Sequence, residues 1–213
     1  MIMELIETEA FQRLRRIKQL GTASLVFHGA ESSRFTHSIG VFSVARKIYK
    51  RLVEINPSFE INKFTLYGAA LLHDIGHGPL SHTSEQIFDH NHEDWSKKLI
   101  TNYQPINLIL KKYGAEIPTS IGNLFNSKNL TDNPLKTLIS SEIDCDRLDY
   151  LLRDSYNTGT KYGLVDLERI ISALIFSPDG GVAIKPKGVI AIEHFLILRN
   201  IMYRSIYNHK INE

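Results

Sequence analysis

Apolar residues recur with the period of an α-helix along most of this chain. Four of them are spaced three apart within residues 8–20, which predicts an amphipathic helix that ends at Gly21. From His37 to Leu52 a longer stripe follows the i, i+4, i+7, i+8, i+11 rhythm of one helix face, so His37 opens a buried stripe. Residues 62–74 are apolar nearly all round, which predicts a central helix that the following glycines end.

The second half of the chain predicts more helices and one small β-element. We expect helices near Glu93–Tyr103, Pro105–Tyr113 and Asp132–Leu152, and a last helix from about His194 to Lys210. The stretch "GGVAIKPKGVIAI" places two apolar runs about a Pro-Lys-Gly turn, which predicts a β-hairpin near the C-terminus. The fold class is therefore mostly α. We expect one domain over residues 1–213, with a helical core over about 1–176 and the hairpin and final helix over 177–213.

Composition and charge narrow the class of protein. Hydrophobic residues make up 43% of the 213 residues and charged residues 23%, which excludes wholesale disorder. The lack of a long apolar window, the acids in the first residues and the single Cys145 together predict a cytoplasmic protein without a membrane span. A net charge of +2 is too small to argue by itself for nucleic acid, which is not expected as a partner, and the basic cluster around Arg13 is interpreted as a solvated helix face.

Histidines are concentrated in one segment of the chain. Five of the nine lie between residues 73 and 92, namely His73, His77, His82, His90 and His92, and the carboxylates Asp74, Glu85 and Glu93 are interleaved with them. A lone histidine on an apolar face is more often a satisfied core residue than a ligand, whereas this density favours a metal site. Imidazoles and carboxylates without thiolates suit a divalent manganese, iron, nickel, magnesium or zinc ion. No H-E-x-x-H motif or C-x-x-C pair occurs, which argues against a structural zinc site.

Two later segments offer polar faces that fit the wall of a site. Asp146, Tyr150 and Asp154 fall at i, i+4 and i+8, close to the anion-binding side chains of Arg147 and Arg153. The alternative is a solvated acidic face.

In the last helix, Arg199, Tyr203, Tyr207 and Lys210 fall at i, i+4, i+8 and i+11. Arginine grips phosphate bidentately and tyrosine can stack on a sugar or base, so a phosphorylated ligand with a ring would be complementary. Surface side chains that snorkel into water are the alternative.

The motifs "RFTHSIGV", "LLHDIGHGPLSH", "NHEDWS" and "DCDRLDYLLRDS", in this order, resemble the HD-domain metal-dependent phosphohydrolases, specifically the deoxynucleoside triphosphate triphosphohydrolase (dGTPase-like) branch. The resemblance runs from "FQRLRRIKQLG" to "RNIMYRSIYNHK", nearly the whole chain, and implies an α-helical HD bundle. By motif, it implies that the metal ligands are His37, His73, Asp74 and Asp146.

The resemblance also implies a reaction, in which metal-bound water attacks the α-phosphorus and deoxynucleoside and tripolyphosphate are released. It points to His82 as the general acid for the leaving oxygen, to His77, His92 and Glu93 as the neighbouring catalytic network, and to Glu85 as the residue that orients His92. Histidine suits proton transfer because its pKa lies near the operating pH.

Substrate and regulatory contacts follow from the same resemblance. Phosphate contacts map onto Arg34, Arg147, Tyr150, Arg199 and His209 or Lys210, and deoxyribose contacts map onto Gln19, Leu20, Asp154 and Tyr207. Glu7, Gln12 and Arg15 occupy the segment where members of this branch bind an activating nucleotide at a subunit interface, so an activator and a homo-oligomer are expected. Members usually extend further at both ends, which suggests a minimal member or a fragment. Arg147 and Glu85 stand where some members carry a lysine and an aspartate.

Two other functions compete with this one. The metal centre could act on a nucleoside monophosphate or another phosphoester, or the HD scaffold could serve as a non-catalytic binder of nucleotides or nucleic acid. Loss of metal ligands would be the sequence sign of a non-catalytic binder, and all the ligands that the motifs specify are present.

Overall fold

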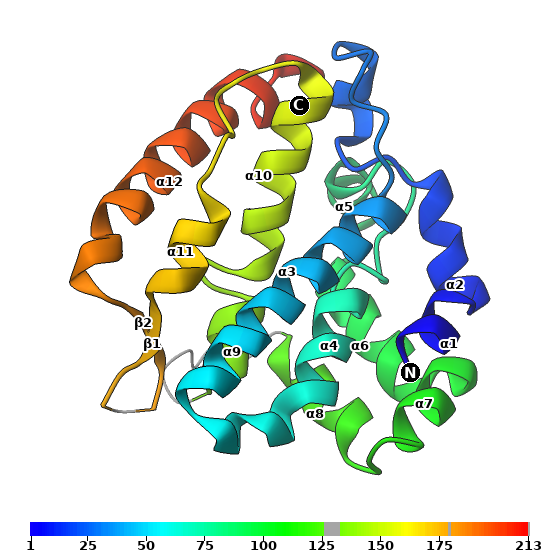
Figure 1. Cartoon of the computed structure of the whole chain (residues 1–213). Coiled ribbons are helices and arrows are strands. Elements are labelled where there is room, and N and C mark those ends of the chain that lie inside the picture. The colour runs from blue at the N-terminus through cyan, green and yellow to red at the C-terminus, as the bar shows by residue number, and fades with distance from the viewer. Residues whose placement is uncertain (126–132, 179, 213) are drawn as a thin grey trace.

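The computed structural model describes residues 1–125, 133–178 and 180–212 and is a bundle of helices with a small two-stranded sheet at one end (Figure 1). The helices are α1 Ile2–Ile6, α2 Glu9–Gln12, α3 Arg34–Ile55, α4 Lys63–Leu72, α5 His82–Phe88, α6 His92–Asn102, α7 Gln104–Lys111, α8 Ile117–Leu124, α9 Pro134–Ile139, α10 Cys145–Thr158, α11 Leu167–Ala173 and α12 Val189–Met202. Strands β1 Leu174–Phe176 and β2 Val182–Ile184 form a small antiparallel sheet. The prediction of a mostly α fold with a small β-hairpin is confirmed.

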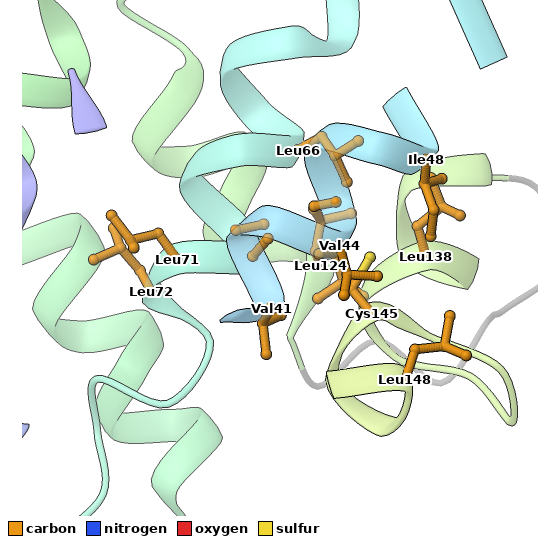
Figure 2. Packing of buried hydrophobic residues seen from close by; sticks show 14 of the residues in the cluster. Val41, Val44, Ile48, Leu66, Leu71, Leu72, Leu124, Leu138, Cys145 and Leu148 are labelled. Carbon is orange, nitrogen blue, oxygen red and sulfur yellow. The ribbon is translucent and has the colours of Figure 1, made fainter. Parts of the chain in front are cut away.

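The core forms where α4 and α10 pack against α3. The side chain of Ser33 caps α3 by accepting a hydrogen bond from the Thr36 N–H, and the helix then runs for 22 residues. Its predicted stripe is buried, and Val41, Val44 and Ile48 lie among leucines of α4, α8, α9 and α10 (Figure 2). Because α4 is also buried along most of its length, the loop that follows it starts inside the bundle.

The first predicted helix is shorter than expected. It ends as α2 at Gln12 and tightens into a 3-10 turn over Arg13–Arg16. The reason is a backbone pairing between distant residues, since the Arg34 N–H donates to the Ile17 carbonyl at 2.9 Å and the Gln19 N–H donates to the Ser32 carbonyl at 2.8 Å. Extended residues before α3 thus draw this segment out of the helix.

The prediction of a single helix over Asp132–Leu152 is wrong, because this stretch holds two separate helices, α9 and α10. The Asp144 side chain interrupts the helix by accepting hydrogen bonds from the N–H groups of Arg147 at 2.8 Å and Ser141 at 3.0 Å. Asp144 is therefore an N-cap instead of a residue inside a helix. Asp132 and residues 126–131 of the loop expected before it lie outside the described residues.

The hairpin uses different residues from those expected. Leu174 pairs with Ile184 and Phe176 with Val182, so the first strand precedes the predicted boundary at residue 177. The apolar run after the Pro-Lys-Gly turn is the start of α12, because Pro186–Gly188 forms a 3-10 turn that leads directly into that helix. Short apolar runs fit a strand and a buried helix equally well by periodicity alone, which explains the error.

The last helix begins at Val189, five residues before its expected start, and continues as a π-helical turn over Tyr203–Tyr207. It lies along α10 and α11 on the side of the molecule away from α1 and α2 (Figure 1). In the part of the chain that the structure describes, no helix combines the length and apolar character that a membrane crossing requires.

Candidate metal centre and pocket

Three helices bring the four predicted metal ligands together. His37 lies in the first turn of α3, His73 and Asp74 follow the end of α4, and Asp146 lies in the first turn of α10. His37 Nε2 is 2.9 Å from Asp146 Oδ1, 3.3 Å from His73 Nε2 and 3.6 Å from Asp74 Oδ2. Ligand atoms of His37, His73 and Asp74 all lie within 4.8 Å of one another, and Asp146 Oδ1 adjoins the two imidazoles at 2.9 and 3.7 Å.

The other nitrogen of each imidazole is fixed by a partner. His37 Nδ1 lies 2.8 Å from Asp149 Oδ2, and Asp149 is held by Arg153 through two hydrogen bonds of 2.7 and 2.8 Å. His73 Nδ1 lies 2.9 Å from the carbonyl oxygen of Ala70. Metal-binding histidines usually hold a carboxylate or carbonyl in this way, because the bond fixes the tautomer and leaves the Nε2 lone pair for the ion.

The electrostatics of this group also fit a cation. Burial opposes protonation of His37, but hydrogen bonds with Asp146 and Asp149 raise its pKa to about 10. Burial likewise opposes ionisation of Asp146, and its hydrogen bonds with His37 and His73 lower its pKa. Positive charge is thus favoured where the four side chains meet, and a nitrogen and oxygen donor set of this kind suits a divalent metal ion.

The loop after α4 is clamped from two sides. Ser96 of α6 accepts a hydrogen bond from the Gly76 N–H at 2.9 Å and donates one to the His73 carbonyl at 2.8 Å. Arg13 donates to the Ile75 and His77 carbonyls at 2.6 and 2.7 Å. Gly76 is needed because a Cβ there would lie 2.2 Å from the His92 carbonyl oxygen, so α6 approaches the loop closely only with glycine at this position.

The guanidinium of Arg34 is already bound by other residues of the pocket. Its guanidinium forms a buried ion pair with Asp74 and donates to the Ser81 hydroxyl at 2.9 Å. The predicted phosphate contact is therefore also a partner of a predicted metal ligand.

A second group of histidines gathers around one carboxylate oxygen. Glu85 Oε1 lies 2.7 Å from His92 Nδ1 and 3.3 Å from the Nδ1 atoms of both His77 and His82. His77 is buried and its other nitrogen lies 3.3 Å from Asp74 Oδ1, so this group adjoins the metal centre. His82 is the outermost member, with a side chain that is 67% exposed.

A pocket of about 800 Å³ joins these groups. The predicted site residues in its wall are Gln19, Leu20, Arg34, His73, Asp74, His77, His82, His92, Glu93, Asp146, Arg147, Tyr150, Asp154, Tyr207 and His209. His37 and Glu85 stand behind this wall, in contact with the wall residues Asp146 and His92.

One side of the pocket is built by α10 and the π-helical turn. The Tyr207 hydroxyl donates to Asp154 Oδ2 at 3.0 Å, and the Tyr207 ring meets the Tyr150 ring edge-on at 5.5 Å between centroids. Burial raises the pKa of Asp154 to about 7. Arg147 is ion-paired with the buried Asp144 at the start of α10.

Other predicted residues lie outside the described wall of this pocket. Arg199 pairs with Glu142, and Lys210 begins the final 3-10 turn. Gln12 and Arg15 bond to each other near the N-terminus at 2.7 Å, and Glu7 is the C-cap of α1.

Sequence reasoning missed the residues that hold the site in shape. Asp149 and Arg153 are four apart on a helix, and this ion-pair spacing could have shown that Arg153 is already bound. Ser96 and Arg13 carried no such signal, because their partners are distant in the sequence. Arg13 is exposed, as the expected solvated face requires, and it also bonds to two carbonyls of the loop.

The chain belongs to the HD-domain phosphohydrolase family. The HD domain model matches residues 34–154, and the model of an HD associated region matches residues 165–213. The first range contains all four predicted metal ligands and the second histidine group.

Curated relatives extend over nearly the whole chain. An uncharacterized protein of Bacillus subtilis, YwfO, is 42% identical over 99% of this chain and 48% of its own length. The deoxynucleoside triphosphate triphosphohydrolase SAMHD1 homolog of Dictyostelium discoideum is 34% identical over 100% of this chain and 44% of its own length. The chain thus spans about half the length of these relatives.

Solved structures show the same fold. A phosphohydrolase from Bacteroides thetaiotaomicron superposes with a TM-score of 0.85 at 34% identity, covering 100% of this chain and 52% of that one. A hypothetical protein from Aquifex aeolicus gives the same TM-score at 35% identity, covering 99% and 56%.

Proposed function

We propose that this protein is a metal-dependent deoxynucleoside triphosphate triphosphohydrolase that releases deoxynucleoside and tripolyphosphate. The observation that carries the proposal is that one pocket joins the HD ligand set, a histidine group and a wall of two tyrosines and an aspartate. Its volume of about 800 Å³ is in the range of small-molecule sites. Relatives whose names state this activity, at 29 to 34% identity, support the choice of substrate class.

The metal would be held by His37, His73, Asp74 and Asp146. A divalent ion there would lower the pKa of bound water and would neutralise charge on the phosphoryl group. Asp149 and Ala70 keep the two imidazoles aimed at it, so the chain's part is to hold the ligands in place.

Proton transfer to the leaving 5' oxygen falls to His82. Its exposed side chain stands at the pocket, next to Glu85 at 3.3 Å. Partial loss of water around the ring where it faces the pocket, and the charge of Arg34, lower the pKa of His82, and the negative charge of a triphosphate in the pocket would raise it again toward the working pH. His92, bonded to Glu85, and His77 and Glu93 complete the proposed network.

The sugar would lie against Tyr207 and Asp154. Asp154 Oδ1 is buried and has no hydrogen-bond partner among the described residues, so it is available to a sugar hydroxyl. A tyrosine packed against the ring would leave no room for a 2'-hydroxyl, which favours deoxyribose. Gln19 and Leu20 line the same pocket, and Arg147 and His209 offer phosphate contacts.

Each deoxynucleotide, incubated with the purified protein and manganese, should give tripolyphosphate. Orthophosphate from a nucleoside monophosphate would instead favour the phosphomonoester alternative. Nucleotide activation through Glu7, Gln12 and Arg15, a homo-oligomer, and a cytoplasmic location stay predictions.

A further inference from the structure

We propose that Ser81 is a positioning residue for phosphate recognition, and that its hydroxyl holds the Arg34 guanidinium so that one nitrogen is offered to a phosphate oxygen. The inference rests on the proposed function, because it names the residue that aims one of the proposed phosphate contacts. Both residues line the pocket, and both are buried, Ser81 at 2% and Arg34 at 3% exposure.

The Ser81 hydroxyl joins two segments that are far apart in the sequence. It accepts a hydrogen bond from Arg34 Nε at 2.9 Å and donates one to the Lys18 carbonyl at 2.7 Å. An arginine can only donate, so the hydroxyl must accept from it, and its single proton is then left for the carbonyl. The two bonds therefore reinforce one orientation of the hydroxyl.

The guanidinium of Arg34 is held at two of its three nitrogens. Nη1 forms the ion pair with Asp74, and Nε donates to Ser81. Because a guanidinium is planar, bonds at two different nitrogens fix both its position and its plane. Among the described residues Nη2 has no hydrogen-bond partner, which leaves it for an anion in the pocket.

The backbone at Ser81 is strained. Leu80 and Ser81 have φ angles of 66° and 54°, and the ψ angle of Ser81 is −129°. Glycine adopts such angles freely, whereas a Cβ makes them costly. Strained residues other than glycine are concentrated at functional sites, where the surrounding structure holds them in place. A serine at this position therefore indicates that its hydroxyl is used.

Neighbouring contacts hold the strained turn without the hydroxyl of Ser81. The Ser84 hydroxyl donates to the Ser81 carbonyl at 2.9 Å, and the Ser81 N–H donates to the Gly78 carbonyl at 3.2 Å. Gly21 lets the turn approach, because a Cβ there would lie 2.8 Å from the Leu80 carbonyl oxygen. We therefore expect the turn to persist when only the hydroxyl is removed.

Two variants separate the hydroxyl from the strain. Ser81→Ala removes the hydroxyl and keeps the Cβ, whereas Ser81→Gly removes the hydroxyl and relieves the strain. A positioning role predicts the same loss of phosphate affinity in both variants. A purely structural role of the strained backbone predicts a difference between them.

The test measures binding of inorganic tripolyphosphate to the full chain by calorimetry, with Mg²⁺ in excess in both solutions. Ser81→Ala and Ser81→Gly should each weaken binding by about 10-fold, the order expected for one hydrogen bond to a charged group. Ser84→Ala is the matched control. It removes a buried hydroxyl from the same turn that bonds to the Ser81 carbonyl and not to Arg34, so it should bind as the wild type does.

A double-mutant cycle shows whether Ser81 acts through Arg34. Arg34→Lys keeps a positive charge next to Asp74 but has no Nε–H for the hydroxyl. In the Arg34→Lys background, Ser81→Ala should therefore weaken binding by no more than about twofold. An equal loss in both backgrounds would mean that Ser81 acts independently of Arg34 and would overturn the proposal.

Other outcomes of the same titrations also decide the matter. Wild-type affinity in Ser81→Ala or in Ser81→Gly, or no binding of tripolyphosphate by the wild-type chain, would overturn the proposal. Circular dichroism checks the fold, and if Ser81→Ala does not fold, Ser81→Gly alone and in the Arg34→Lys background gives the answer. Because binding needs no turnover, an absence of dNTP hydrolysis would reject the proposed function and leave the role of Ser81 standing.

Discussion

His37 Nδ1 lies 2.8 Å from Asp149 Oδ2, and this contact fixes the orientation of the imidazole whose Nε2 meets the other candidate ligands of the metal centre. The guanidinium of Arg153 in turn holds Asp149 through two hydrogen bonds. Gly40 makes room for this pair, because a Cβ there would lie 1.9 Å from Asp149 Oδ1. The metal centre thus depends on residues that would touch neither ion nor substrate.

Asp149→Asn should weaken metal binding while the fold is kept. Asparagine retains the size of the side chain but loses the negative charge that supports the His37 imidazole and pairs with Arg153. We expect metal affinity at the HD ligand set to fall by about 10- to 100-fold. Competition with a chelating dye measures it. Glu168→Gln, an exposed acid paired with Lys47, is the control and should bind as the wild type does; equal affinity in both variants would argue against the orienting role.

Asp146→Ala and His82→Ala should separate metal binding from turnover. With one equivalent of metal supplied, Asp146→Ala should lose both the ion of the HD ligand set and all activity, because it removes a ligand. His82→Ala should keep that ion and lose turnover by about 10²- to 10⁴-fold, the usual contribution of general acid–base catalysis. Metal analysis and initial rates on the same preparations decide the matter. Loss of the HD ion in His82→Ala would refute the division of roles.

Ser96→Ala should destabilise the protein. The hydroxyl is fully buried and serves both the Gly76 N–H and the His73 carbonyl, so its removal leaves two backbone groups without this partner. A cost of about 1 to 3 kcal/mol in the free energy of unfolding is expected. Urea denaturation measures it against Ser172→Ala, an exposed serine that bonds within its own helix. If the two variants unfold at the same urea concentration, Ser96 does not clamp the loop.

Asp154 should make stability depend on pH. Burial raises its pKa to about 7 in the folded protein, above the value of about 3.9 expected in the unfolded chain. The folded state therefore holds a proton that the unfolded state has released, and stability falls as pH rises from about 4 to about 7. Asp154→Asn removes this loss. In metal-free protein, the stability of the variant relative to the wild type should grow across that range, and parallel curves would count against a raised pKa.

The long helices were predictable because their apolar faces repeat without interruption. The stripe from His37 to Leu52 is α3, and the apolar segment ahead of His73 is α4. The break between α9 and α10 was not predictable. The Asp144 side chain caps α10, but in the hydrophobic periodicity Asp144 counts only as one more polar position. The hairpin shifted for a related reason, since its apolar runs fit a strand or a helix equally well.

The candidate site was predictable for those residues that lie together in one sequence motif. The resemblance supplied His73 and Asp74 as neighbours, and the structure brings His37 to them from 36 residues earlier in the chain. The supporting contacts were out of reach, because they exist only after folding. Arg13 finds its carbonyl partners 62 and 64 residues away, and no local pattern marks such a pair.

Product analysis in ¹⁸O-labelled water tests the proposed activity most directly. Attack of water at the α-phosphorus transfers its oxygen to the triphosphate, and the 5' oxygen leaves with the deoxynucleoside. We therefore expect labelled tripolyphosphate and unlabelled deoxynucleoside from each active dNTP, in a reaction that Asp146→Ala abolishes. Orthophosphate, pyrophosphate or labelled deoxynucleoside as the product, or no hydrolysis of any dNTP with manganese, iron, nickel, magnesium or zinc, would contradict it.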